Sequence, residues 1–250
     1  MDVVIGIPIY RQGSYILNEF MSNQKQIQKN YPSSELILAT SEQDFIKELE
    51  SHIGFWKLKG KVLLYKVVKP DYARSSIWDI ACGREAIREY VLHQTEAKYF
   101  LFLDADMTFE TSVIEVLGKE IQGYDVVFCG YPLRSYGVGL AGAGCVMFTR
   151  STLEKVKFRC YEFKNGEVIF EDNLLEVDLF RLGSQVKKSF LLYIQHHISP
   201  TEIRYITPKP VGILRKMTNY SFVRYVLIRA SIMLKFNIPW RLKILFNKFR

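Results

Sequence analysis

Short apolar runs alternate with stretches of helical periodicity through the first two thirds of this 250-residue chain. Apolar runs of roughly four to eight residues are typical of buried strands, and apolar positions three and four apart are typical of helices. Their alternation predicts βα units and an α/β fold with a mostly parallel sheet flanked by helices. The predicted strands are Val3–Ile9, Glu35–Ala39, Val62–Val67, Tyr99–Leu103, Val126–Phe128 and Cys145–Phe148. The predicted helices are Tyr15–Gln28, Gln43–Ile53, Ile77–Leu92 and Thr111–Glu120.

The segment Tyr99–Leu103 is apolar at every position, which is typical of a central strand covered by helices on both faces. Asp104 and Asp106 follow it, at the kind of strand end where α/β sheets bind ligands. Because they are two residues apart, an extended backbone projects both carboxylates to one side, where they can share a Mg²⁺ or Mn²⁺ ion. A turn with two solvated acids is the alternative. The glycine-rich segment Tyr131–Gly144 is a long loop near the same edge of the sheet.

Two further acids, Glu171 and Asp172, open the amphipathic stretch Asn173–Leu182. Acids in a first helical turn complement the helix dipole, which contributes about 0.3–1 kcal/mol. A carboxylate at this position can instead act as a general base on an acceptor hydroxyl. The sequence leaves both interpretations open.

A histidine pair, His196 and His197, follows the apolar run Phe190–Ile194. Side chains alternate along a strand, so one imidazole faces the inner side of the strand and the other faces the outer side. The inner imidazole can complete a metal shell begun by carboxylates, or it can be a hydrogen-bonded structural residue.

Taken in order, these features resemble the glycosyltransferase family 2-like enzymes of the GT-A fold, over about residues 3–200. The matching pieces are Ile7–Tyr10, Arg84–Ile87, Phe102–Asp106, Gly142–Arg150, Glu171–Asp172, Phe180–Gly183 and His196. The resemblance implies a Rossmann-like GT-A catalytic domain over residues 1–207. It also implies an inverting enzyme that moves a sugar from a nucleotide-sugar donor to a hydroxyl of a saccharide or lipid-linked acceptor.

The resemblance further implies a role for each matched position. The implied metal ligands, for Mn²⁺ or Mg²⁺, are Asp104, Asp106 and His196, with His197 as the substitute for His196. The implied catalytic base is Asp172, and Glu171 helps to hold the acceptor or the base. The implied donor-binding residues are Pro8, Tyr10, Arg84, Asp104 and Gly144.

The chain departs from the family pattern near the expected nucleobase site. The family usually carries a pair of acids after the second strand, whereas this chain has Ala39–Asp44, with the sequence ATSEQD. Glu85 stands where the family commonly has asparagine, and Arg11 follows Tyr10 where asparagine is usual. Uridine therefore has no support as the base of the donor.

The positive charge of the chain lies in its C-terminal part. The net charge is +8, with 34 Lys and Arg against 26 Asp and Glu. Eleven of the basic residues lie between Arg204 and Arg250, and no acid follows Glu202, so the first 203 residues carry 23 bases against 26 acids. The predicted tail, residues 208–250, is therefore basic, and the body is mildly acidic.

The end of the tail, Trp240–Arg250, has amphipathic spacing, with Leu242, Leu245, Phe246 and Phe249 on one helical face. Arginines and lysines interrupt the longer apolar stretch before it, so we expect no spanning helix. The pattern favours a helix lying on an anionic membrane surface and a cytoplasmic protein peripheral to the inner face of the membrane. A packed subdomain is an alternative. Nucleic-acid binding is less favoured, because the tail is richer in apolar and aromatic residues than phosphate binding requires.

Other features separate the competing functions. The four cysteines have no short regular spacing, which indicates reduced core or turn residues, and the N-terminus predicts no signal peptide.

A metal-dependent nucleotidyltransferase is the alternative enzyme, but Pro8–Gly13 holds only one glycine and one arginine for a phosphate loop. A non-catalytic membrane-associated scaffold is the third possibility, and the retained acids and His196 argue against it.

Overall fold

The computed structural model describes residues 2–134, 138–139, 142–208, 226 and 230. Apart from residues 226 and 230, these belong to one compact unit, Met1–Val211. The amphipathic tail predicted for residues 208–250 thus lies almost entirely outside the described residues. None of the helices in the described part of the chain is long and apolar enough to cross a membrane.

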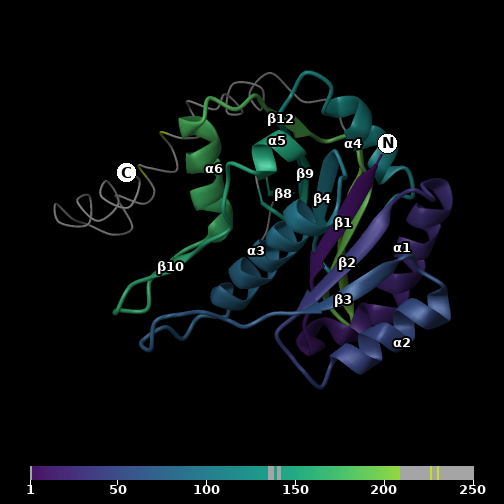
Figure 1. Cartoon of the computed structure of the whole chain (residues 1–250), viewed down its shortest axis with the longest axis horizontal. Coiled ribbons are helices and arrows are strands. Elements are labelled where there is room, and N and C mark those ends of the chain that lie inside the picture. The colour runs from purple at the N-terminus through teal and green to yellow at the C-terminus, as the bar shows by residue number, and fades with distance from the viewer. Residues whose placement is uncertain (1, 135–137, 140–141, 209–225, 227–229, 231–250) are drawn as a thin grey trace. The chain divides into compact units, whose positions relative to one another are not determined.

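The core of the unit is a seven-stranded, mostly parallel sheet (Figure 1). Its strands, in spatial order, are β12 (Val186–Ser189), β6 (Val126–Cys129), β9 (Cys145–Thr149), β4 (Tyr99–Leu103), β1 (Val3–Pro8), β2 (Glu35–Thr40) and β3 (Gly60–Leu64). Only β9 runs antiparallel to its neighbours, between β4 and β6. The predicted strands are confirmed, although β3 begins and ends two to three residues earlier than its apolar run.

Helices cover both faces of this sheet, as the uninterrupted apolar strands predict. The helices are η1 (Arg11–Ile16), α1 (Leu17–Asn30), α2 (Ile46–Trp56), α3 (Ile77–Gln94), α4 (Val113–Glu120), α5 (Arg150–Leu153) and α6 (Glu171–Arg181). Alternate residues of β1 enter different cores: Ile5 packs with the buried residues of α1 and α4, and Val4 packs with those of α3 and α6. Helix α3 packs directly against β1 and β2 (Figure 1).

Three small sheets add to this frame. They are β5 (Met107–Phe109) with β13 (Ile194–Ser199) and β14 (Glu202–Ile206), β7 (Tyr131–Pro132) with β8 (Val138–Gly139), and β10 (Tyr161–Glu162) with β11 (Val168–Ile169). In the first of them β13 pairs with β5, so that His196 lies opposite Met107. This pairing brings the histidine pair to the acids that follow β4.

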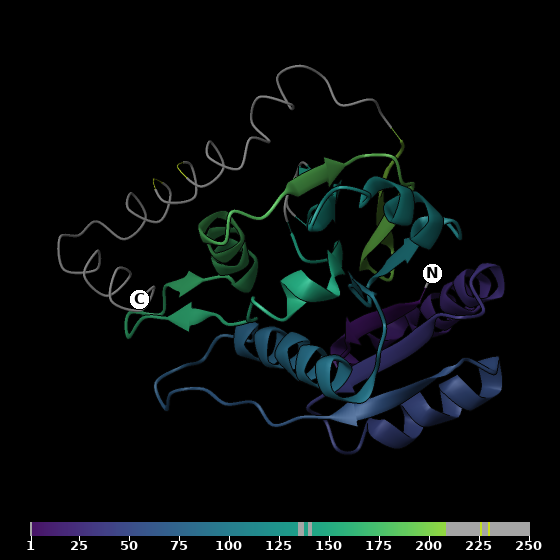
Figure 2. The same cartoon turned by 45° about the horizontal axis from the view of Figure 1, so that its top comes forward.

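A buried acid of the hairpin β10–β11, Glu162, holds the segment that leads into α3. Glu162 accepts hydrogen bonds from the backbone N–H groups of Arg74 (2.8 Å) and Ser75 (3.0 Å) and from Nε1 of Trp78 (3.1 Å). Figure 2 shows the two strands of the hairpin beyond the end of α6. All four cysteines are free thiols, and three of them are buried, as the sequence predicts.

Candidate active site

Asp104 lies at the end of β4 between an arginine and a glycine. Its backbone N–H donates to the carbonyl of Gly144 at 3.0 Å, and its Oδ1 accepts a hydrogen bond from Arg84 Nη2 at 2.6 Å. A Cβ atom on residue 144 would lie 2.5 Å from Asp104 Oδ2. Only glycine therefore lets the start of β9 approach this carboxylate.

Arg84 is a buried residue of α3, only 3% exposed, and it joins Asp104 to Glu171 through one guanidinium. Burial alone would lower the pKa of Arg84, but the two carboxylates outweigh it and raise the pKa. A buried charge is tolerable only when it is paired in this way, so the guanidinium stays charged and fixes both acids.

Glu171 and Asp172 begin α6 and differ in their surroundings. Glu171 is 5% exposed, and burial raises its pKa to about 7, against the opposing charge of Arg84 and with the added repulsion of Asp172. Within the described part of the chain, Oε2 of Glu171 has no hydrogen-bond partner. Asp172 is only half-buried, and its charge contributes to the raised pKa of Tyr131. One acid is thus held in the interior, and its neighbour is open to solvent.

Asp106 faces His196 across the β5–β13 pairing. His196 Nδ1 lies 2.6 Å from the carbonyl oxygen of Pro132, and His196 Nε2 lies 3.3 Å from Oδ2 of Asp106. A carbonyl can only accept, so Nδ1 carries a proton, and in the neutral ring the Nε2 lone pair then faces a carboxylate oxygen. Two facing acceptors require a proton or a metal cation between them. An imidazole nitrogen and a carboxylate oxygen are a donor set typical of a divalent-metal site.

The pKa values of this pair follow from the same contact. Burial would lower the pKa of His196, but the hydrogen bond and the charge of Asp106 outweigh it and raise the pKa. Burial would raise the pKa of Asp106, and the contributions of His196 and Arg134 together lower it. For Asp104, by contrast, burial dominates and raises the pKa despite Arg84.

His197 points to the other side of β13, as strand alternation requires. Its Nε2 lies 3.4 Å from Thr108 Oγ1 and 3.6 Å from Glu19 Oε1. Its backbone N–H donates to the carbonyl of Asp106 at 2.9 Å. The structure therefore brings the imidazole of His196, and not that of His197, to the Asp106 carboxylate.

The expectation of an extended backbone between Asp104 and Asp106 is wrong. Residues 105 and 106 form a turn, in which the N–H of Met107 reaches the carbonyl of Asp104 at 3.3 Å. The two carboxylates consequently take different partners, Arg84 for the first and His196 for the second. Among the residues that the structure describes, no group of three or more His, Cys, Asp or Glu gathers for a metal ion.

Two further side chains lie in this region, Arg134 and Tyr131, and neither was predicted from the sequence as a site residue. Arg134 forms an ion pair with Oδ2 of Asp106 and donates to the carbonyl of Ile198 at 3.2 Å. Tyr131 is buried, and its ring centroid lies 6.4 Å from that of His196. A Cβ atom on Gly142 would lie only 1.7 Å from the Tyr131 hydroxyl oxygen. The available signal was the glycine-rich loop itself, since its glycines make room for this ring.

Pro8 and Tyr10 meet α3 one residue before Arg84. A Cβ atom on Gly83 would lie 3.1 Å from Cβ of Pro8 and 3.2 Å from the Tyr10 hydroxyl. The Tyr10 hydroxyl lies 2.8 Å from that of Tyr65, which donates to the carbonyl of Asp79 at 2.9 Å. Burial raises the pKa of Tyr10, so its hydroxyl stays protonated.

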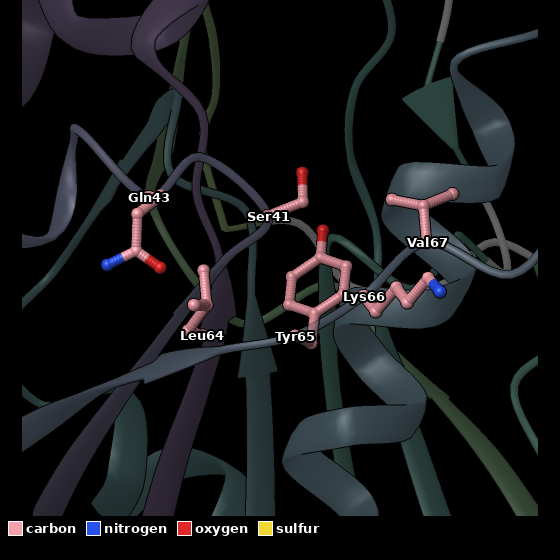
Figure 3. A pocket seen from close by; sticks show the side chains of 6 residues that line it. All are labelled: Ser41, Gln43, Leu64, Tyr65, Lys66 and Val67. Atoms are coloured by element: carbon pink, nitrogen blue, oxygen red, sulfur yellow. The ribbon is translucent and has the colours of Figure 1, made fainter.

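A pocket of about 570 Å³ opens on the other side of Tyr65, beyond the carboxyl ends of β2 and β3 (Figure 3). The side chains that line it are those of Ser41, Gln43, Leu64, Tyr65, Lys66 and Val67. These six residues include one aromatic ring, one cation and no acid. The hydroxyl of Ser41, one of the lining residues, donates to Oδ1 of Asp79 at 3.3 Å, so a carboxylate lies next to the pocket lining.

No protein-family model and no curated protein sequence matches the chain. Among solved structures it resembles residues 1–349 of TarS from S. aureus in complex with UDP-GlcNAc, with a TM-score of 0.54 and 13% identity, over 93% of this chain and 67% of that one. The described unit has the GT-A glycosyltransferase fold. The mannosyltransferase PcManGT from Pyrobaculum calidifontis, in complex with GDP-Man and Mn²⁺, gives a TM-score of 0.51 and 11% identity, over 75% of this chain and 54% of that one. The chain spans 40% of a longer TarS structure.

The raised pKa of Glu171 makes a testable contribution to stability. Its folded value of about 7 exceeds its ordinary value of 4.5, so the folded state holds a proton that the unfolded state releases in this window. We expect the resulting stabilisation, at most about 3 kcal/mol, to be present below pH 4.5 and lost as the pH rises to about 7. Urea unfolding at several pH values, compared with Glu171→Gln, measures this difference. Parallel pH dependences of the two proteins would contradict it.

Proposed function

We propose that this protein is an inverting glycosyltransferase that moves a sugar from a nucleotide-sugar donor to a hydroxyl acceptor. The observation that carries the proposal is the buried bridge Asp104–Arg84–Glu171, which ties the acids after β4 to the start of α6. On a GT-A fold the donor binds at the carboxyl end of the sheet. The bridge connects this end of the sheet with the carboxylates that are available for catalysis. The presence of UDP-GlcNAc and GDP-Man in two proteins of this fold supports the proposal.

The donor nucleoside belongs in the pocket beyond β2 and β3. The Tyr65 ring offers a stacking surface for a base, and Ser41, Gln43 and Lys66 offer polar groups at its edge. The hydrogen bond between Tyr65 and Tyr10 connects this pocket to the residue pair Pro8 and Gly83 beside Arg84. A donor lying along this path would have its diphosphate near Asp104 and Asp106.

Asp106 and His196 are the residues that would hold a divalent cation, Mn²⁺ or Mg²⁺. The Pro132 carbonyl keeps a proton on Nδ1 and leaves Nε2 of His196 facing the Asp106 carboxylate, so these residues fit such an ion. When bound, the cation would neutralise charge on the donor diphosphate and help it to leave. The Mn²⁺ in PcManGT supports the use of a divalent cation. Asp104, paired with Arg84, would face the donor and not the cation.

Asp172 is the proposed general base. Its half-buried position at the first turn of α6 lets it reach an acceptor hydroxyl, while Glu171 beside it is held by Arg84. The base takes the hydroxyl proton as the acceptor oxygen bonds to the anomeric carbon. The bond from that carbon to the diphosphate oxygen breaks, and the nucleoside diphosphate leaves with the electron pair. Attack opposite to the leaving group inverts the configuration.

The basic tail is proposed to associate with a membrane surface, on the cytoplasmic side, where a lipid-linked acceptor would be presented. Its support is in the sequence: eleven cations and no acid after Glu202, together with the amphipathic end Trp240–Arg250. Cations attract anionic lipid, and the apolar face enters the headgroup boundary. The described residues of the body, which the sequence makes mildly acidic, do not share this charge.

Metal-dependent donor binding is tested by thermal shift with UDP, GDP and their sugar conjugates, with and without Mn²⁺. A ligand at about 100 times its Kd stabilises the native state by about 2.7 kcal/mol, which raises Tm by roughly 5–10 °C. We expect one nucleotide to give this shift only with Mn²⁺, and Asp106→Ala to lose it. Glu115→Ala, on the exposed side of α4, is the control and keeps the shift. Equal binding by Asp106→Ala would remove Asp106 from the metal site.

The base is tested by Asp172→Asn, which keeps the size of the side chain and removes its ability to take a proton. We expect donor binding to persist and transfer to fall by about 10² to 10⁴-fold. Radiolabelled sugar transfer gives the rate, and the anomeric configuration of the product is read by NMR. Wild-type transfer by the variant, or retention of configuration by the parent, would exclude this role.

The tail is tested by ending the chain after Thr207. We expect the shortened protein to keep the nucleotide-dependent thermal shift and to lose flotation with anionic liposomes, since each cation near the surface contributes about 1 kcal/mol. High salt should weaken binding of the full chain only in part, because screening leaves apolar insertion intact. An unfolded truncation, or a full chain that ignores anionic vesicles, would indicate a packed subdomain.

A further inference from the structure

Arg134 is the outermost contact of the Asp106 carboxylate. Its Nη2 forms an ion pair with Oδ2 of Asp106, the same oxygen that faces Nε2 of His196. The Arg134 side chain is 58% exposed, whereas that of Asp106 is 18% exposed. The guanidinium therefore covers the solvent side of the one carboxylate oxygen that the proposed cation needs.

The backbone beneath Arg134 is fixed independently of its side chain. Arg204, on β14, donates through Nη1 to the carbonyl oxygens of Leu133 (3.0 Å) and Arg134 (2.8 Å). Among the described residues, the guanidinium also contacts the carbonyl of Ile198 at 3.2 Å and the hydroxyl of Tyr15. The base of the side chain is thus held in place while its tip can exchange partners at small cost, as is usual for an exposed ion pair.

We propose that Arg134 is the counter-ion of Asp106 before a cation binds and a ligand of the donor diphosphate afterwards. This inference rests on the proposed function. A divalent cation at Oδ2 repels the guanidinium and satisfies the carboxylate, which releases the arginine. A diphosphate bound to that cation then supplies the oxygens that an arginine fork prefers, directly beside its starting position.

This exchange predicts opposite effects of one substitution on two ligands. Arg134→Ala removes the competitor for Asp106, so Mn²⁺ alone should bind about two- to fivefold more tightly, the size of an exposed ion pair. The same variant lacks the fork for the diphosphate, so the nucleoside diphosphate should bind about 10- to 100-fold more weakly at saturating Mn²⁺. A purely structural role for Arg134 would move both affinities in the same direction.

Isothermal titration of the full chain measures both quantities, first with Mn²⁺ alone and then with UDP or GDP in excess Mn²⁺, using the nucleotide that the wild type prefers. Arg134→Lys keeps the charge and loses the fork, so we expect near wild-type Mn²⁺ affinity and weakened nucleotide binding. Arg159→Ala is the matched control, because that arginine pairs with Asp178 on α6 and should leave both affinities unchanged. Unchanged thermal unfolding without ligand verifies that each variant is folded.

The outcomes separate the two proposals. Opposite shifts in Arg134→Ala support the exchange. If Arg134→Ala binds both ligands as the wild type does, or binds both more weakly, the exchange is overturned while the metal-dependent donor site stands. If the wild-type protein binds neither Mn²⁺ nor any nucleotide, the proposed function fails, and the exchange fails with it.

Discussion

The guanidinium of Arg84 is the contact on which the arrangement of the site depends. It is 3% exposed, it comes from the middle of α3, and it pairs with acids that lie 20 and 87 residues further along the chain. An uncompensated buried charge would cost several kcal/mol. The unit is therefore stable only while β4, α3 and α6 keep the relative positions that pair Arg84 with both acids. The requirement that stabilises the fold also sets the positions of Asp104 and Glu171.

The acids around Arg84 and around Asp106 have different electrostatic surroundings. Asp104 and Glu171 share the buried guanidinium of Arg84, and burial raises the pKa of each acid. Asp106 is paired with His196 and Arg134, whose contributions together lower its pKa and keep it ionised. A pair of acids that Arg84 holds in place and a third carboxylate with an exchangeable partner suit a site that must hold a charged donor and then release a charged product.

The sequence predicted the central strands of the sheet because they are apolar on both faces. It missed the edge strand β12, in which Lys187 and Lys188 interrupt the apolar pattern. The end of β4 and its acids followed from the same pattern. The predicted strand Val62–Val67 ended three residues late because its residues continue past Leu64, the last β3 residue in register with β2, and it began two residues late because Gly60 and Lys61 also pair with β2. Hydropathy indicates which residues are buried, but it does not indicate where backbone pairing between neighbouring strands ends.

Partners distant in sequence were beyond prediction from local patterns. Asp104 and Asp106 are joined by a turn at residues 105 and 106 and take different partners, and the choice between His196 and His197 depends on the register of β13 with β5. The contact of Arg134 with Asp106 has no local signature at all. The family resemblance named most of the residues that the fold gathers, but the pairings among them came only from the coordinates.

The central claim is that Asp106 and His196 hold the cation that meets the donor diphosphate. Anomalous diffraction from crystals grown with Mn²⁺ and the preferred nucleoside diphosphate tests it most directly. The account predicts a manganese peak within coordinating distance of an Asp106 oxygen and of His196 Nε2, with diphosphate oxygens on its open side. A manganese peak on His197 or Glu171, or a nucleotide bound at this edge with no manganese beside it, would contradict the account.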